Sequence, residues 1–208
     1  HRYAPRPADR KSFPHIHREH PEHPYPAALE DALASYQWLL DHGWNGDQII
    51  VVGDSAGGGL AMALTMYLRD HDMPMPCGLV AMSPWTDLTA SGESYTLNYE
   101  LDPLFGNTKE SMIYINDYPG EHDKKDPYIS PIYGHFRQFP PMLIQVGSTE
   151  MLLSDSVTAA SMADIVGVEV RLSIYDDMFH VFQLSGKILP EQKKAWEEVE
   201  QFLQLLLN

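Results

Sequence analysis

The sequence predicts an α/β protein built on a mostly parallel β-sheet with helices on both faces. Small and apolar runs lie at 49–52, 77–82 and 142–146, and segments with helical spacing separate them. Strands that are apolar on both faces are typical of parallel sheets covered on each side. The first run also ends in Gly-Asp-Ser-Ala-Gly before a second small and apolar run, which indicates a strand, a sharp turn and a helix.

Length and charge limit the classes of partner. The 208 residues suffice for one domain with a sizeable core. A formal net charge of −15 disfavours nucleic-acid binding and docking to anionic membranes, because both need clustered Lys and Arg. The single cysteine, Cys77, allows no internal disulfide, and neither a leader nor a membrane-spanning apolar run is visible. We therefore expect a cytoplasmic protein with no membrane span and no nucleic-acid partner.

The first twenty residues differ from the rest of the chain. They are basic and proline-containing, and they have neither a helical nor a strand period. His15, His17, His20 and His23 could ligate a metal, but cysteine partners and a rigid scaffold are lacking nearby. We expect a poorly structured basic arm over 1–20, no metal site, and one folded domain over 21–208.

The remaining elements follow in order. Residues 24–43 form a predicted helix, with Pro26 suited to its first turn and Gly43 ending it. The helix after the 49–52 strand runs to about Asp70 and is apolar on nearly every side, which predicts burial. Residues 168–174 alternate between apolar and polar, which predicts a half-exposed edge strand. A second copy could pair along 168–175, although a solvated edge explains the pattern equally well; residues 190–207 form a closing amphipathic helix.

Residues 86–140 are irregular and rich in proline, with one predicted helix around Lys109–Asp117. Long connections at the carboxyl ends of parallel strands tend to form substrate pockets. Apolar residues of this region could line such a pocket, although ordinary core packing explains each about as well: Tyr99, Leu104, Phe105, Met112, Tyr118 and Tyr128.

Ser55 is the candidate nucleophile. It lies in Gly53-x-Ser55-x-Gly57, the pattern in which a strand turns into a helix with the serine at the apex. We expect a Cβ at Gly53 or Gly57 to collide with a neighbouring element. The following helix points its positive end at the serine, where an oxyanion forms in acyl transfer. A phosphate-binding loop is the alternative, but neither GxGxxG spacing nor a Gly-Lys-Ser/Thr ending is present.

A serine nucleophile needs a histidine base. His180 follows the predicted edge strand within an apolar collar, which is the expected place for that base. His71 and His122 have the surroundings of surface residues, whereas His135 in the irregular region remains an alternative.

The base needs a carboxylate to orient it, and in this architecture the acid lies between the serine and the histidine. Glu150 directly follows the 142–146 strand, at the same end of the sheet as Ser55. Asp155 is the alternative, although Ser154-Asp155 more naturally caps a helix starting there. Asp176 and Asp177 are too near His180 in the chain to reach the far ring nitrogen.

Several motifs in register carry a family resemblance. They are Pro21-Glu22-His23-Pro24-Tyr25-Pro26, Gly53-Asp54-Ser55-Ala56-Gly57-Gly58, Ser83-Pro84-Trp85-Thr86-Asp87-Leu88, Asp126-Pro127-Tyr128-Ile129-Ser130-Pro131 and the region of His180. From about residue 21 to the end, the chain resembles the hormone-sensitive-lipase-like α/β-hydrolases, the bacterial family IV esterases. The resemblance implies an α/β-hydrolase-type sheet and a carboxylic-ester hydrolase for short-chain acyl esters, without metal or organic cofactor. It implies Ser55 as nucleophile, Glu150 as acid and His180 as base, followed by Val181 where the family usually has glycine.

The chain departs from that family upstream. No His-Gly-Gly-Gly segment, which supplies most of the family's oxyanion hole, precedes Pro21. We therefore expect the family's front strands and amino-terminal cap to be missing or altered. Of the usual donors, the backbone N–H of Ala56 remains. Because one lost donor costs about 10²–10³ in turnover, we expect a shortened or altered esterase of reduced activity. The alternative is a non-catalytic small-molecule binder on the same fold, as in the gibberellin-receptor relatives.

Overall fold

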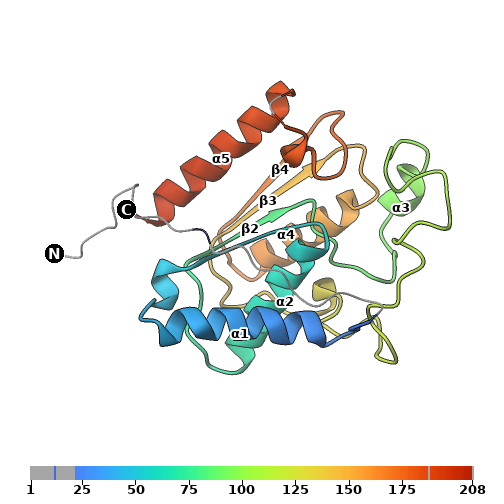
Figure 1. Ribbon diagram of the computed structural model, residues 1–208. Coiled ribbons are helices and arrows are strands. Elements are labelled where there is room, and N and C mark those ends of the chain that lie inside the picture. Colours follow the sequence, from blue (N-terminus) through green and yellow to red (C-terminus); the bar gives the residue numbers. More distant parts are fainter. Residues whose placement is uncertain (1–11, 13–21, 187, 208) are drawn as a thin grey trace.

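A computed structural model describes residue 12 and residues 22–186 and 188–207. Its strands and its three longest helices follow the predicted order (Figure 1). The helices and strands are α1 (Ala27–Asp41), β1 (Ile50–Asp54), α2 (Ala56–Asp70), β2 (Gly78–Met82), α3 (Ser94–Leu97), β3 (Met142–Gly147), α4 (Leu153–Ile165), β4 (Val170–Tyr175) and α5 (Pro190–Leu206). Short 3₁₀ turns lie at η2 (Gly46–Gln48), η3 (Pro131–Tyr133) and η4 (Phe182–Leu184).

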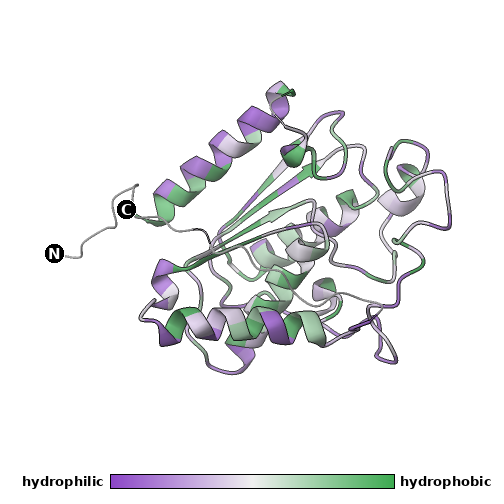
Figure 2. Ribbon diagram, viewed as in Figure 1, coloured by the Kyte–Doolittle hydropathy of each residue, from purple (hydrophilic) through white to green (hydrophobic). Residues whose placement is uncertain are grey.

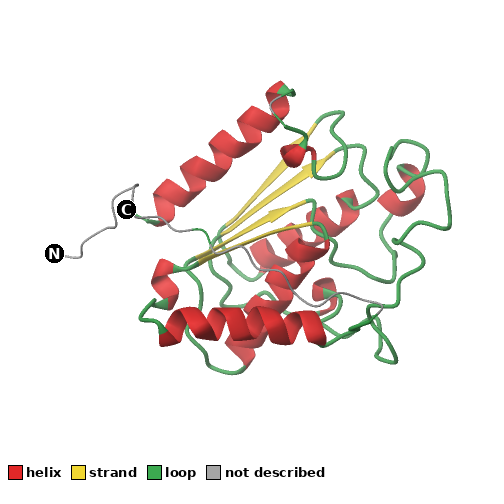
Figure 3. Ribbon diagram, in the orientation of Figure 1, coloured by secondary structure: helices red, strands yellow, loops and turns green. Residues whose placement is uncertain are grey.

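The sheet is parallel throughout and confirms the predicted fold class. Its four strands lie in the order β1-β2-β3-β4, each beside its successor in the sequence (Figure 3). Helix α5 lies on one face, and α1, α2 and α4 lie on the other (Figure 1). The carboxyl ends of all four strands therefore meet at one edge of the sheet, where the segments after β1, β2, β3 and β4 are brought together.

The core has one layer on each side of the sheet because alternate residues of a strand point to opposite faces. In β2, Leu79 and Ala81 pack with the α2 and α4 side, whereas Val80 and Met82 pack with the α5 side. Helix α5 turns its apolar stripe, with Val199 and Phe202, toward the sheet and its charged face outward (Figure 2). Most of α2 is buried, as its apolar sequence predicted. The sheet is thus held rigidly beneath the loops at its carboxyl edge.

Both outer strands are partly exposed. The edge position predicted for 168–174 is confirmed, since β4 ends the strand order and Ile174 is 45% exposed. The burial expected of the 49–52 run is wrong at Val52, which is 53% exposed. The reason is that β1 is the other outer strand among the described residues and has a strand neighbour on one side only. Pairing of a second copy along β4 stays a prediction.

The helix predicted around Lys109–Asp117 is wrong. The segment consists of turns, with the N–H groups of Tyr114 and Ile115 both bonded to the carbonyl of Ser111. The Lys109 ammonium lies 4.6 Å from the Tyr99 ring centre and 4.0 Å from the Tyr114 ring centre. A segment without a continuous apolar stripe gains little from forming a helix.

Two further expectations concern particular parts of the chain. Apart from residue 12, the predicted arm over 1–20 lies outside the described residues, as do His15, His17 and His20. Among the residues that the structure covers, no cluster of three His, Cys, Asp or Glu side chains is arranged to hold a metal ion. None of the described helices is both long and apolar enough to cross a membrane.

Candidate active site

Ser55 lies at the apex between β1 and α2. Its backbone has φ 52° and ψ −123°, a conformation rare for a residue with a side chain and typical of strained functional turns. Hydrogen bonds to the chain leaving β2 stabilise the turn: the Ser55 N–H donates to Met82 O at 2.9 Å, and Ser55 O accepts from the Trp85 N–H at 2.9 Å. The strain at the serine is thereby offset by contacts with the neighbouring strand.

Glycines permit the close approach around this turn. A Cβ on Gly53 would lie 2.2 Å from Gly57 O, and one on Gly59 would lie 2.1 Å from Trp85 O. The collision expected at Gly57 is wrong, because no atom lies within 4 Å of a Cβ built there. The restriction falls instead on Gly58 and Gly59, where α2 passes against the chain following β2.

His180 joins the candidate nucleophile to the candidate acid. The residue follows β4 and is 7% exposed. Its Nε2 lies 2.9 Å from Ser55 Oγ, and its Nδ1 lies 2.9 Å from Glu150 Oε2. An ionised carboxylate only accepts hydrogen bonds, so Nδ1 carries the proton and Nε2 of the neutral ring accepts from the Ser55 hydroxyl. The structure therefore brings together the three side chains that the sequence predicted.

Glu150 is completely buried at the end of β3. A buried carboxylate must be matched by donors, and here Oε1 accepts from the Gly147 N–H at 2.5 Å and from Ser83 Oγ at 2.7 Å. The Glu150 and His180 loops also touch, since Thr149 Oγ1 donates to Met178 O at 2.7 Å. A Cβ on Gly147 would lie 2.1 Å from Met178 O, so only glycine allows this approach.

Asp155, the alternative acid, lies in another network. Its Oδ2 accepts from the N–H groups of Thr86 at 2.7 Å and Asp87 at 2.8 Å, and its Oδ1 accepts from the Tyr95 hydroxyl at 2.9 Å. Burial raises the pKa of Asp155 to about 7, although these hydrogen bonds act in the opposite direction. Its expected capping role is wrong, because α4 begins with Leu152 as N-cap and Asp155 instead fixes the loop after β2.

The described contacts of His71, His122 and His135 lie outside this site. His135 is exposed, and its backbone carbonyl accepts from Arg69. His71 stacks on Tyr67 with ring centres 3.8 Å apart, and His122 contacts Tyr25. The surface positions predicted for His71 and His122 are confirmed, and the structure gives His135 no contact with Ser55.

One backbone donor is available beside Ser55. Ala56 is the first residue of α2, and its N–H forms no hydrogen bond within the part of the chain that the structure describes. The first N–H groups of a helix lack intrahelical partners and carry the positive end of the helix dipole. An anion beside Ser55 would meet a donor of this kind.

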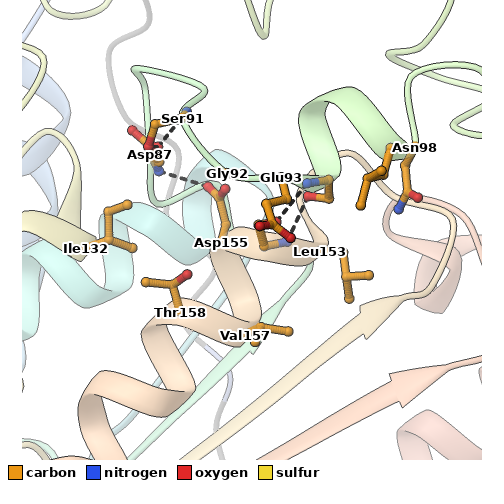
Figure 4. Close-up of a pocket in the computed structure, with 13 residues that line it drawn as sticks. Asp87, Ser91, Gly92, Glu93, Asn98, Ile132, Leu153, Asp155, Val157 and Thr158 are labelled. Atoms are coloured by element: carbon orange, nitrogen blue, oxygen red, sulfur yellow. Dashed lines mark hydrogen bonds between the residues drawn. The ribbon is translucent and has the colours of Figure 1, made fainter.

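The pocket shown in Figure 4 is separate from this site. It is about 550 Å³ in volume and lies between the loop after β2 and α4. Its lining includes Asp87 and Thr158 but not Ser55, Glu150 or His180. The apolar residues proposed as pocket lining do not gather there either. Phe105 packs edge-on against the His180 ring, with centres 4.7 Å apart. Tyr99 and Tyr118 pack with Phe105 against one buried cluster, whereas Leu104 and Met112 are exposed.

Sequence analysis missed the residues that hold the acid and its surrounding loop. Ser83 appeared only as part of a motif, yet it contacts Glu150. Buried Asp102 accepts from the N–H groups of Phe105 at 3.0 Å and Met151 at 2.8 Å, and thereby links the loop that contacts His180 to the residue after Glu150. The available signal for Ser83 was its place directly after a fully apolar strand, at the same sheet edge as Glu150.

Several known proteins are similar to this chain in sequence and in structure. Residues 16–184 match the alpha/beta hydrolase fold family. This chain belongs to the alpha/beta hydrolase family. It is 38% identical over 187 residues to an acetyl-hydrolase of Streptomyces hygroscopicus, which covers 90% of the chain and 62% of that protein. It is 37% identical over 203 residues to an esterase of Acinetobacter venetianus, which covers 94% of the chain and 65% of that protein.

Solved structures agree. An esterase from the bacterial hormone-sensitive lipase family superposes with a TM-score of 0.87 at 41% identity, over 92% of this chain and 64% of that one. The predicted resemblance to hormone-sensitive-lipase-like α/β-hydrolases is confirmed. The chain spans a little under two thirds of the length of these relatives.

Proposed function

We propose that this alpha/beta hydrolase is a serine carboxylesterase that cleaves short-chain acyl esters, with Ser55 as nucleophile, His180 as base and Glu150 as the orienting acid. One observation carries the proposal: the hydrogen-bonded series from Ser55 Oγ through both nitrogens of His180 to Glu150 Oε2, with 2.9 Å at each link. A serine hydroxyl is a weak nucleophile until a base accepts its proton, and this series supplies that base.

Each step assigns a proton and a bond. Ser55 Oγ attacks the ester carbonyl carbon while Nε2 of His180 takes the hydroxyl proton. Glu150 stabilises the imidazolium through Nδ1–H. When the tetrahedral intermediate collapses, Nε2–H gives its proton to the leaving alcohol and the acyl group stays on Ser55. Water then attacks the acyl-enzyme, His180 takes its proton, and the acid product leaves as Ser55 regains its hydrogen.

The negative charge on the carbonyl oxygen needs donors. The Ala56 N–H and the amino end of α2 lie directly after Ser55 and are suited to that charge. Esterase and acetyl-hydrolase relatives support a small acyl group as the substrate's acid part.

The test is hydrolysis of p-nitrophenyl acetate by the protein and by Ser55→Ala. We expect release of p-nitrophenol to fall to the uncatalysed rate in the variant. Ser156→Ala is the control for removal of a serine hydroxyl, because Ser156 is buried and its hydroxyl has no hydrogen-bond partner among the described residues. Equal rates for the protein and Ser55→Ala would end the proposal.

Binding a small molecule without turnover is the alternative function. A fluorophosphonate probe separates the two functions, since only an activated serine reacts with it. Labelling of the protein but not of Ser55→Ala supports the esterase, and absence of labelling supports the binder.

A further inference from the structure

We infer that Ser83 is a positioning residue for the proposed reaction: its hydroxyl holds the Glu150 carboxylate and the backbone after His180 in one hydrogen-bonded ring. The inference rests on the proposed function. It goes beyond that function because Ser83 is not one of the three residues assigned to the reaction and lies directly after β2.

The direction of each hydrogen bond follows from the groups involved. The Val181 N–H can only donate, and it donates to Ser83 Oγ at 3.1 Å. The single hydroxyl proton of Ser83 is then free for Glu150 Oε1, 2.7 Å away, and the other carboxylate oxygen accepts from His180. The ring runs from Val181 through Ser83 and Glu150 to His180 and closes through the peptide bond between His180 and Val181.

Burial makes this ring decisive for the carboxylate. Ser83 and Glu150 are each 0% exposed, so water cannot replace a lost donor without a rearrangement. With Ser83 removed, the Gly147 N–H is the remaining donor on Oε1. A carboxylate held on one side only is free to rotate about its last bond, and Oε2 then loses its alignment with Nδ1 of His180.

The backbone at both ends of the Ser83 contact is strained. Ser83 has φ 48° and Val181 has φ 52° and ψ 39°, and a left-handed conformation is especially unfavourable for a β-branched residue. Such conformations persist where surrounding contacts impose them. Here the two strained residues bond to each other, since the Val181 N–H donates to Ser83 Oγ. The strain therefore occurs where the loop of Glu150 and the loop of His180 are held in alignment.

Two substitutions separate the hydroxyl from the backbone. Ser83→Ala removes the hydroxyl and keeps the strain, whereas Ser83→Gly removes the hydroxyl and suits the positive φ. Ser156→Ala again serves as the control for a buried serine. We expect kcat for p-nitrophenyl acetate to fall about 10- to 100-fold in both Ser83 variants, the range for one hydrogen bond to a charged group. We expect KM to change less than about twofold, since Ser83 is fully buried.

A readout independent of turnover is the NMR resonance of the His180 Nδ1 proton, identified by its loss in His180→Ala. A short hydrogen bond to a carboxylate shifts this proton downfield, and we expect it to move upfield or to broaden in both Ser83 variants. Thermal unfolding measures folding separately, and we expect Ser83→Gly to be at least as stable as Ser83→Ala.

The outcomes are distinct. An unchanged kcat together with an unchanged Nδ1 resonance in Ser83→Gly overturns the inference. Full recovery of kcat in Ser83→Gly, when Ser83→Ala is impaired, also overturns it, because backbone strain and not the lost hydroxyl would then cause the fall in kcat. If the unsubstituted protein shows no Ser55-dependent hydrolysis, the proposed function fails, and the Nδ1 resonance alone decides the role of Ser83.

Discussion

His180 Nδ1 lies 2.9 Å from Glu150 Oε2, with both side chains buried. This contact fixes which ring nitrogen carries the proton of the neutral histidine, and hence which one faces Ser55.

The first prediction concerns the charge of Glu150. Glu150→Gln keeps the size of the side chain and lets an amide oxygen accept from Ser83, but its amide group faces Nδ1 and favours the wrong tautomer. We expect kcat to fall about 10³- to 10⁴-fold, as when a triad carboxylate becomes an amide. Steady-state kinetics measure it, and a loss below about twofold would contradict the role of Glu150.

The second prediction is the pH dependence of hydrolysis. Protonated His180 has no lone pair on Nε2 with which to accept the Ser55 proton, so kcat/KM should fall as the pH is lowered. Steady-state kinetics over a series of buffers measure this fall. A value of kcat/KM that does not change with pH would argue against a histidine base.

The third prediction is a pH dependence of stability caused by Asp155. Burial raises its pKa to about 7 in the folded protein, against about 3.9 in an unfolded chain. At a pH between these two pKa values, Asp155 holds a proton in the folded state that it has lost in the unfolded state. The stabilisation that this proton contributes to the free energy of unfolding is therefore full below about pH 4 and is lost as the pH rises to about 7.

Asp155→Asn should remove this contribution. Urea unfolding of the protein and the variant at several pH values measures it, as the difference between the two curves. Neighbouring Asp87 does not titrate in this pH range. Burial raises the pKa of Asp87, but hydrogen bonds from Ser91 and Thr89 lower it by more, so the pKa of Asp87 is below its ordinary value. A difference between the protein and Asp155→Asn that is constant with pH would refute the assignment.

The fourth prediction uses a matched pair of glycines in α2. Gly59→Ala would place a Cβ 2.1 Å from the Trp85 carbonyl oxygen, and backbone must move to accommodate it. We expect a loss of about 1–3 kcal/mol in the free energy of unfolding. Gly57→Ala meets no atom within 4 Å and should be neutral or slightly stabilising. Equal stabilities of the two variants would contradict the packing described here.

Sequence patterns were sufficient for the sheet and for the three residues of the hydrogen-bonded series. The apolar runs identify the buried strands, and in a parallel sheet their carboxyl ends share one edge, so residues after β1, β3 and β4 must lie near one another. Ser55, Glu150 and His180 follow from that rule together with their chemistry. The exposure of Val52 could not be predicted in this way, because the same apolar pattern describes an inner strand and an outer strand.

Tertiary contacts account for what the sequence did not predict. Asp155 has the local pattern of a helix cap, yet buried N–H groups 68 and 69 residues away occupy its carboxylate. Lys109 has helical surroundings in the sequence, but two tyrosine rings determine its place. The role of Ser83 depends on partners 67 and 98 residues away, and no local spacing contains that information.

The central claim is that His180 activates Ser55 to form an acyl-enzyme, and the most direct measurement is mass spectrometry of protein quenched during turnover of p-nitrophenyl acetate. The account predicts one acetyl group on the peptide that contains Ser55, and none in His180→Ala quenched at the same time. An unmodified Ser55 during active turnover, or equal acetylation with and without His180, would contradict it.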